Sequence, residues 1–138
     1  MIDHRQSEEG TQHAPVWLVV WQLDRFRNLK RGEEFSFGSS DDEGLEQIFS
    51  RIVRDGPSVG VHAWIWADSF STASRWLSRA TLNDCEVRLL MQMSTADSNH
   101  LIDSNAAAHL GPQLALLYDH ASGLTEKVRP VVLDDSKR

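Results

Sequence analysis

Apolar residues are spaced differently in successive stretches of this chain, and the spacing predicts alternating strands and helices. Residues 16–21 are a continuous run of β-branched and aromatic side chains, which is typical of a strand covered on both faces in a parallel sheet. Apolar runs at 59–67 and 87–93 predict two further strands. Because helix-sized intervals separate the three runs, the pattern indicates a repeat of strand and helix.

Between the strands, apolar residues recur with a helical period. After residue 42 they fall at i, i+3, i+4, i+7 and i+8, which predicts one buried helical face that ends before Gly56 and Pro57. A second helix is predicted to begin at Ser71 or Thr72, and Ser94 opens a capping box for a third helix. The predicted buried residues of the three helices are Leu45, Ile48, Phe49, Ile52 and Val53, then Ala73, Trp76, Leu77 and Ala80, then Leu101 and Ile102.

The last third of the chain predicts a short helix and two closing strands. The helix covers 106–110, and the strands cover 114–118 and 126–133 around a turn at 119–123. Alternation of strands and helices along the whole chain predicts an α/β fold with a largely parallel sheet and flanking helices. The short final connection permits an antiparallel closing pair.

Length and composition indicate one compact core. The chain has 138 residues, a common size for a single domain. We expect a flexible lead-in at 1–14, a core at 15–133 and a charged tail at 134–138. The five tryptophans, Trp17, Trp21, Trp64, Trp66 and Trp76, are predicted to fill core layers, and Trp21 and Trp66 are also candidates for an open interface.

Charge, cysteine content and hydropathy narrow the class of protein. A formal net charge of −6 argues against a surface that wraps a polyanion. Cys85 is the single cysteine, so no internal disulfide can form, as is typical of a cytoplasmic protein. No apolar run approaches the roughly 20 residues that a bilayer crossing needs, and the polar N-terminus does not look like a signal peptide. We therefore expect a cytoplasmic protein with no membrane segment.

Candidate metal ligands are scattered. The six histidines lack the spacing of a zinc site, and the single cysteine has no partner thiol. The sequence therefore predicts no metal site in this chain.

Two segments carry a resemblance to a known family. The first begins with Gly60, Val61 and His62 and continues as an apolar strand. In the second, Arg88 begins a strand that leads to Ser94 and then to the pair Asp97 and Ser98. These segments resemble the C-terminal half of the motor core of FtsK/SpoIIIE-type DNA translocases, which are P-loop ATPases. The resemblance extends from about residue 16 to residue 132 and implies a RecA-like P-loop NTPase half-domain.

The resemblance assigns two residues to a catalytic site. In the family, an Asp-Glu pair after the first of these strands holds magnesium and polarises the attacking water; this chain has Trp21 and Gln22 there. Gln22 thus occupies the catalytic Glu position in degenerate form, since an amide is a poor proton acceptor. Asp68 occupies the position of a sensor residue, and the alternative is that Asp68 or Ser69 simply caps the following turn or helix.

Five further residues match family positions at the nucleotide or at the subunit interface. The sequence contains no Gly-x-x-x-x-Gly-Lys-Ser/Thr loop for the phosphates. The resemblance therefore implies that a missing N-terminal half of the core supplies this loop, and that ATP and magnesium bind only in the complete protein. The five candidates are Arg54, Arg88, Asp97, Ser98 and Arg129.

Two functions follow as expectations. In the first, the chain is the C-terminal portion of an ATPase module that forms a homo-oligomeric ring and takes part in ATP-dependent translocation or segregation of double-stranded DNA. In the second, suggested by Trp21 and Gln22, the chain is a catalytically inactive pseudo-ATPase that acts as an oligomerisation or protein-binding scaffold. In both, this chain alone binds no cofactor and hydrolyses no ATP.

Overall fold

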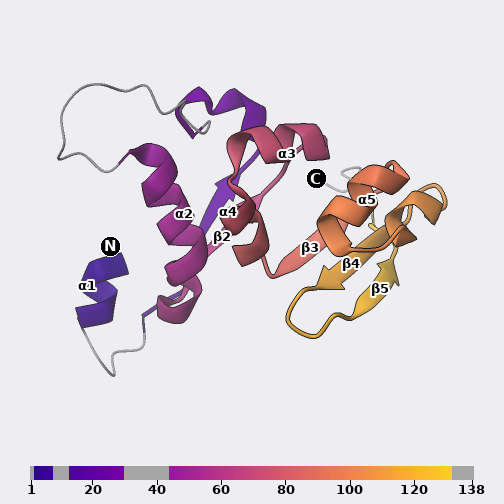
Figure 1. The fold of residues 1–138 in the computed structure, drawn as a ribbon. Coiled ribbons are helices and arrows are strands. Elements are labelled where there is room, and N and C mark those ends of the chain that lie inside the picture. Colours follow the sequence, from indigo (N-terminus) through magenta and orange to yellow (C-terminus); the bar gives the residue numbers. More distant parts are fainter. Residues whose placement is uncertain (1, 8–12, 30–43, 132–138) are drawn as a thin grey trace, which may run out of the picture. The chain divides into compact units, whose positions relative to one another are not determined.

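The computed structural model describes residues 2–7, 13–29 and 44–131. They divide into two compact units, Met1–Cys85 and Glu86–Arg138, and each unit has its own sheet (Figure 1). The predicted tail 134–138 and most of the loop between the first strand and the first long helix lie outside the described residues.

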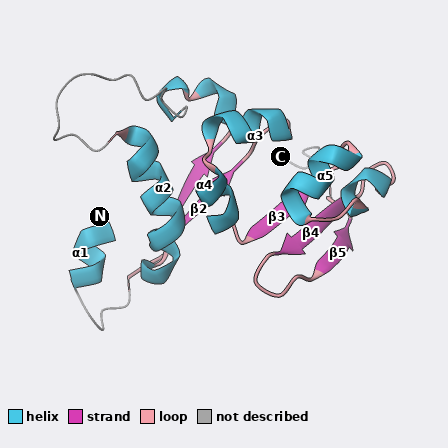
Figure 2. Ribbon diagram, viewed as in Figure 1, coloured by secondary structure: helices cyan, strands magenta, loops and turns pink. Residues whose placement is uncertain are grey.

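The Met1–Cys85 unit combines a parallel pair of strands with short helices (Figure 2). Its strands match the first two predicted strands within one or two residues at each end. In chain order its elements are α1 (Ile2–Ser7), β1 (Val16–Val20), the 3-10 helices η1 (Leu23–Arg25) and η2 (Arg27–Leu29), α2 (Leu45–Asp55), the 3-10 helix η3 (Gly56–Val59), β2 (Val61–Ile65), α3 (Phe70–Trp76) and α4 (Arg79–Asp84).

Strands β1 and β2 pair in parallel, in register from Val16↔Val61 to Val20↔Ile65. Helix α2 connects them and packs most of its predicted apolar face on one side of the pair, where Phe49 is buried beside Val20. Leu45 was predicted to be buried but is exposed at the start of the helix. The core consists of Val20, Leu23, Phe49, Val53 and Leu77, and the residues that pack against it include Ala63, Ile65, Trp76 and Cys85.

Helix α2 ends where the chain must pass close to β2. A Cβ atom on Gly56 would lie 2.5 Å from the carbonyl oxygen of Val61. Only glycine fits this approach without a shift of the backbone.

The predicted helix with a stripe from Ala73 to Ala80 is two helices, and Ala80, which was predicted to be buried, is exposed in the second. Ser69 accepts a hydrogen bond from the Thr72 N–H and caps α3, which confirms the alternative role predicted at this place and shows that the start at Ser71 or Thr72 was predicted too late. Ser78 accepts from the Thr81 N–H and caps α4, while Leu77 between them is extended. The apolar stripe did not reveal this break, because a serine hydroxyl stabilises a new helix start more than it stabilises a helix interior.

The Glu86–Arg138 unit is built on an antiparallel sheet of order β3-β4-β5. Leu90, Ile102, Ala107, Leu110 and Leu116 form its core. Ser94 accepts from the Asp97 N–H at 3.1 Å, which confirms the predicted helix cap. The elements are β3 (Val87–Leu90), α5 (Thr95–Ile102), the 3-10 helix η4 (Ala106–His109), β4 (Ala115–Asp119) and β5 (Thr125–Val128).

The sheet topology confirms one expectation and corrects another. The closing strands β4 and β5 are antiparallel, as their short connection permits. The prediction of a largely parallel sheet was wrong. Among the described residues, parallel pairing joins only β1 and β2, whereas β3 pairs with β4 in the antiparallel direction. Strand β3 contributes Leu90 to a core shared with β4, α5 and η4, and this packing directs its pairing. The fold is therefore mixed α/β, with a small parallel pair and a separate antiparallel sheet.

The core of the first unit can be tested at Phe49, which is 5 % exposed. We expect Phe49→Ala to lower the free energy of unfolding of this unit by about 3–5 kcal/mol, because a cavity replaces the ring. Urea unfolding followed by tryptophan fluorescence measures this loss, since all five tryptophans lie in this unit. The control Gln47→Ala, on the exposed side of α2, should change the value by less than about 0.5 kcal/mol. Equal effects of the two substitutions would contradict the described core.

Candidate functional site

Two of the predicted residues lie at the carboxyl-terminal edge of the β1–β2 pair. Because the strands are parallel, both end at this edge, where the Trp66 N–H donates to the Val20 carbonyl at 2.9 Å and the Leu23 N–H donates to the Trp66 carbonyl at 3.0 Å. Gln22 follows β1, and Asp68 follows β2. Gln22 is half-buried and has left-handed backbone angles, with φ 60° and ψ 78°.

Asp68 is exposed and belongs to the start of helix α3. The Ser69 hydroxyl donates to its Oδ1 at 3.1 Å. A hydrogen bond from the Thr72 side chain is the largest cause that lowers the pKa of the Asp68 carboxyl below its ordinary value, and a hydrogen bond from the Ser69 side chain lowers it further. A carboxylate at this place is favourable because the first turn of a helix presents unpaired N–H groups.

The residues at this edge do not by themselves fit magnesium and a triphosphate. Trp21, at the position of the family's magnesium-binding Asp, stacks its ring on Trp66 with centroids 4.8 Å apart and planes 15° apart. Asp68 is the one carboxylate among the residues that the resemblance assigns here, and its oxygens have local partners. Within the part of the chain that the structure describes, no group of three His, Cys, Asp or Glu side chains is arranged to hold a metal ion.

Arg54 lies away from this edge. It belongs to the last turn of α2, beside η3, which leads into the amino-terminal end of β2. Its Nε and Nη2 donate to the two carboxylate oxygens of Asp55 at 2.9 and 3.0 Å. This bidentate pair raises the pKa of Arg54 and lowers the pKa of Asp55. The Arg54 guanidinium is thus engaged locally at the surface.

The other four candidates belong to the Glu86–Arg138 unit. Arg88 donates to the Leu101 carbonyl, and its guanidinium carbon lies 5.8 Å from the centre of the Tyr118 ring. Ser98 is fully buried: its hydroxyl donates to the Ser104 carbonyl and accepts from the Ala107 N–H, and so it ties α5 to η4. The Asp97 N–H binds the Ser94 cap. Arg129 is exposed just after β5.

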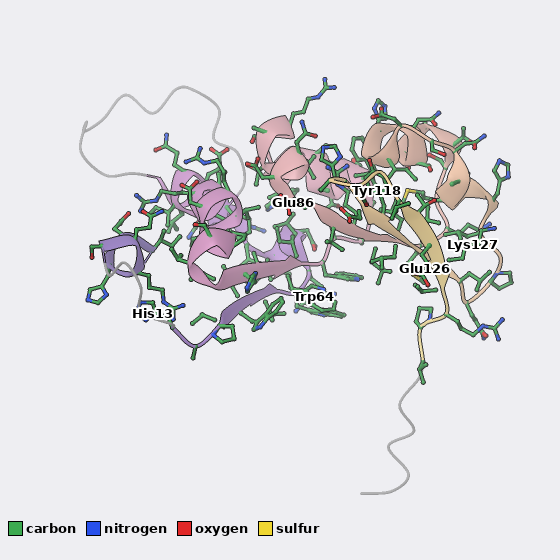
Figure 3. All side chains as sticks on the ribbon, turned by 90° about the horizontal axis from the view of Figure 1, so that it is seen from below. His13, Trp64, Glu86, Tyr118, Glu126 and Lys127 are labelled. Carbon is green, nitrogen blue, oxygen red and sulfur yellow. The ribbon has the colours of Figure 1, made fainter. Side chains whose placement is uncertain are left out.

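The outer side of the β1–β2 pair carries a row of aromatic residues that we call the tryptophan face. It lies opposite the side on which Val20, Ala63 and Ile65 meet the core. Figure 3 labels Trp64, which projects on this outer side. The face consists of Trp17, Val19 and Trp21 from β1 and its end, and His62, Trp64 and Trp66 from β2 and its end.

The tryptophan face is ordered by cross-strand contacts and is largely uncovered. Trp17 stacks on His62 with ring centroids 4.8 Å apart, and Trp21 stacks on Trp66 at the same distance. The exposed fractions are 60 % for Trp17, Val19 and Trp21, 59 % for Trp64 and 36 % for Trp66.

This exposure corrects two expectations from the sequence. The first strand is covered on one face rather than both, and of the five tryptophans only Trp76 packs against the buried core cluster. Trp17, His62 and Trp64 were not predicted as parts of a site. The signal that could have found them is the alternation of aromatic residues in both strands, which puts every second residue on one face.

Comparison of the chain with protein-family models, with curated proteins and with solved structures finds no match. None of the described helices combines the length and the apolar character that a bilayer crossing requires.

Asp68 provides a test of the local geometry by pH. Its lowered pKa means that the folded state is favoured above the ordinary carboxyl pKa of 3.8, and that this contribution is lost as the pH falls through the lowered folded value. We expect Thr72→Val to raise the pKa of Asp68 in the folded chain, as measured by carboxyl-carbon NMR titration. Ser74→Ala, which removes a hydroxyl that donates to the Ser71 carbonyl, is the control and should leave the titration unchanged. An unchanged pKa in Thr72→Val would contradict the assigned hydrogen bond.

Proposed function

We propose that this chain is an assembly module that binds another polypeptide through its tryptophan face, which is the scaffold alternative among the two expected functions. The observation that carries the proposal is the exposure of Trp17, Trp21 and Trp64 on one side of a parallel strand pair. Parallel sheets are normally covered on both faces, and proteins rarely expose large contiguous apolar patches without a binding role. Tryptophan is also enriched at the centres of protein interfaces.

The chemistry of the face favours a polypeptide partner over a nucleic acid. Aromatic platforms that bind single strands are combined with basic grooves that neutralise phosphates. The tryptophan face contains no Lys or Arg, and the chain carries a formal net charge of −6. Contact with an apolar protein surface, by contrast, gains free energy by burying the indole rings, and such a surface brings no unpaired charge into the interface.

Catalytic inactivity is part of this proposal. Trp21 cannot hold a magnesium ion, and its ring is part of the tryptophan face. Gln22 cannot take a proton from water as a glutamate does. The proposed module therefore retains strands and helices for assembly and carries out no nucleotide chemistry of its own.

Photo-crosslinking in cells that naturally express the gene tests the binding role. We expect Trp64→p-benzoylphenylalanine to give a protein adduct at least about tenfold more abundant than Asn83→p-benzoylphenylalanine, because position 64 faces the partner whereas Asn83 is an exposed residue of α4. Mass spectrometry identifies the adduct. A second substitution on the face, Val19→Glu, should abolish it. Adducts of equal yield from positions 64 and 83, or none from either, would overturn the proposal.

A second candidate function is that of a DNA-translocating motor, and one observation favours it. Gln22 and Asp68 follow neighbouring parallel strands at one edge, which is where ligands bind in open α/β sheets. In this proposal the chain is part of a RecA-like core in the cytoplasm. The missing N-terminal half, in the complete protein, supplies the phosphate loop, ATP and magnesium bind between the halves, and a ring of subunits moves double-stranded DNA.

The two candidates differ in what the full-length gene product does with ATP. The motor function predicts saturable ATP binding and turnover by that protein, and no binding by residues 1–138 alone. It also predicts that Gln22→Glu in the full-length protein raises kcat by at least about tenfold, because a carboxylate replaces an amide as proton acceptor. Equilibrium dialysis and phosphate release measure the two quantities. Absence of ATP binding by the full-length protein would reject the motor function and leave the assembly module.

A further inference from the structure

The tryptophan face is arranged as a ladder of three rungs. The first rung is Trp17 with His62, the middle rung is Val19 with Trp64, and the third rung is Trp21 with Trp66. Both outer rungs are stacked pairs of aromatic rings with the same centroid separation, 4.8 Å. If the ladder is turned end to end, the first and third rungs exchange places, and aromatic rings again occupy both ends.

We propose that the occupant of this face is a second copy of the chain, related to the first by a two-fold axis through the middle rung. This inference rests on the proposed assembly function and names its partner. In such a dimer the first rung of each copy packs on the third rung of the other, and the two Trp64 side chains lie near the axis. A two-fold interface requires a surface that is complementary to itself, and the reversible ladder meets that requirement.

The area of the face is adequate for such a dimer. Tryptophan, the largest aromatic residue, lies at the upper end of the roughly 150–250 Å² that a buried aromatic side chain removes from water. From their exposed fractions, the four tryptophans then offer about 540 Å² per copy, and Val19 brings the total to about 600 Å². Complete burial of this area in both copies would remove about 1,200 Å² from water, which is the lower end of the range for specific interfaces. Residues around the rim of the face would add to this area.

The charges also permit two copies to meet. Each chain has a formal net charge of −6, so most of its surface repels another copy. The six residues of the tryptophan face include no Asp, Glu, Lys or Arg, and pairing face to face therefore brings no like charges into contact. Apolar burial is then the main favourable contribution to contact through this face.

Sedimentation velocity of the full chain over about a hundred-fold range of concentration tests the dimer. We expect a reversible monomer–dimer equilibrium in the unaltered chain, and an association constant at least about tenfold lower in Trp64→Glu, because each copy would bury an unpaired carboxylate at the axis. Leu124→Glu is the matched control: it makes the same change of charge at a residue that is 71 % exposed outside the face, and it should leave the association constant unchanged.

Circular dichroism spectra of both variants establish that they remain folded, and Val19→Glu provides a second substitution in the middle rung if Trp64→Glu does not fold. A monomer at every concentration, or a dimer that Trp64→Glu and Val19→Glu leave intact, would overturn the inference. Crosslinking from position 64 distinguishes a failure of the dimer inference from a failure of the proposed assembly function. An adduct with another protein rejects the second copy but retains the assembly module, whereas no adduct rejects both.

Discussion

The parallel pairing of β1 with β2 is the constraint on which the Met1–Cys85 unit depends. Its register places alternate side chains of both strands on the same side, so that Val20 and Ile65 face the core while Val19 and Trp64 face outward. A slip of either strand by one residue would exchange the two sets of side chains. The packing around Phe49 and the composition of the tryptophan face are therefore two consequences of one register.

Local hydrogen bonds explain why the residues of the family resemblance are structurally engaged. Asp68 lies beside the Ser69 cap of α3, and Asp97 lies in the first turn of α5, behind the Ser94 cap. Ser98 is buried between two helical segments. Each residue type stabilises a helix start or a turn in any fold, so its presence in family order is compatible with a structural role as well as with a nucleotide site.

The sequence predicted local structure well where one signal dominated. Helical spacing located α2, and the serine at position 94 located the start of α5. The break at Leu77 was missed, because the apolar stripe continues through it while the Ser78 hydroxyl begins a new helix. At the candidate site, the family resemblance placed Gln22 just after the first strand, where the structure has it, whereas the outward exposure of Trp64 was not predicted.

By itself the sequence determined where most strands and helices form, because side-chain direction alternates along every strand and repeats along every helix. It predicted neither the helix at Ile2–Ser7 nor the division into α3 and α4 at Leu77. The tertiary structure alone decided which strands pair and which face is covered. β3 joins β4 because Leu90 and Leu116 pack in one core with Ile102, and residues so far apart in the chain meet only in the folded unit. The outer face of β1 and β2 stays open because α2 packs on the other side, a choice that no local pattern encodes.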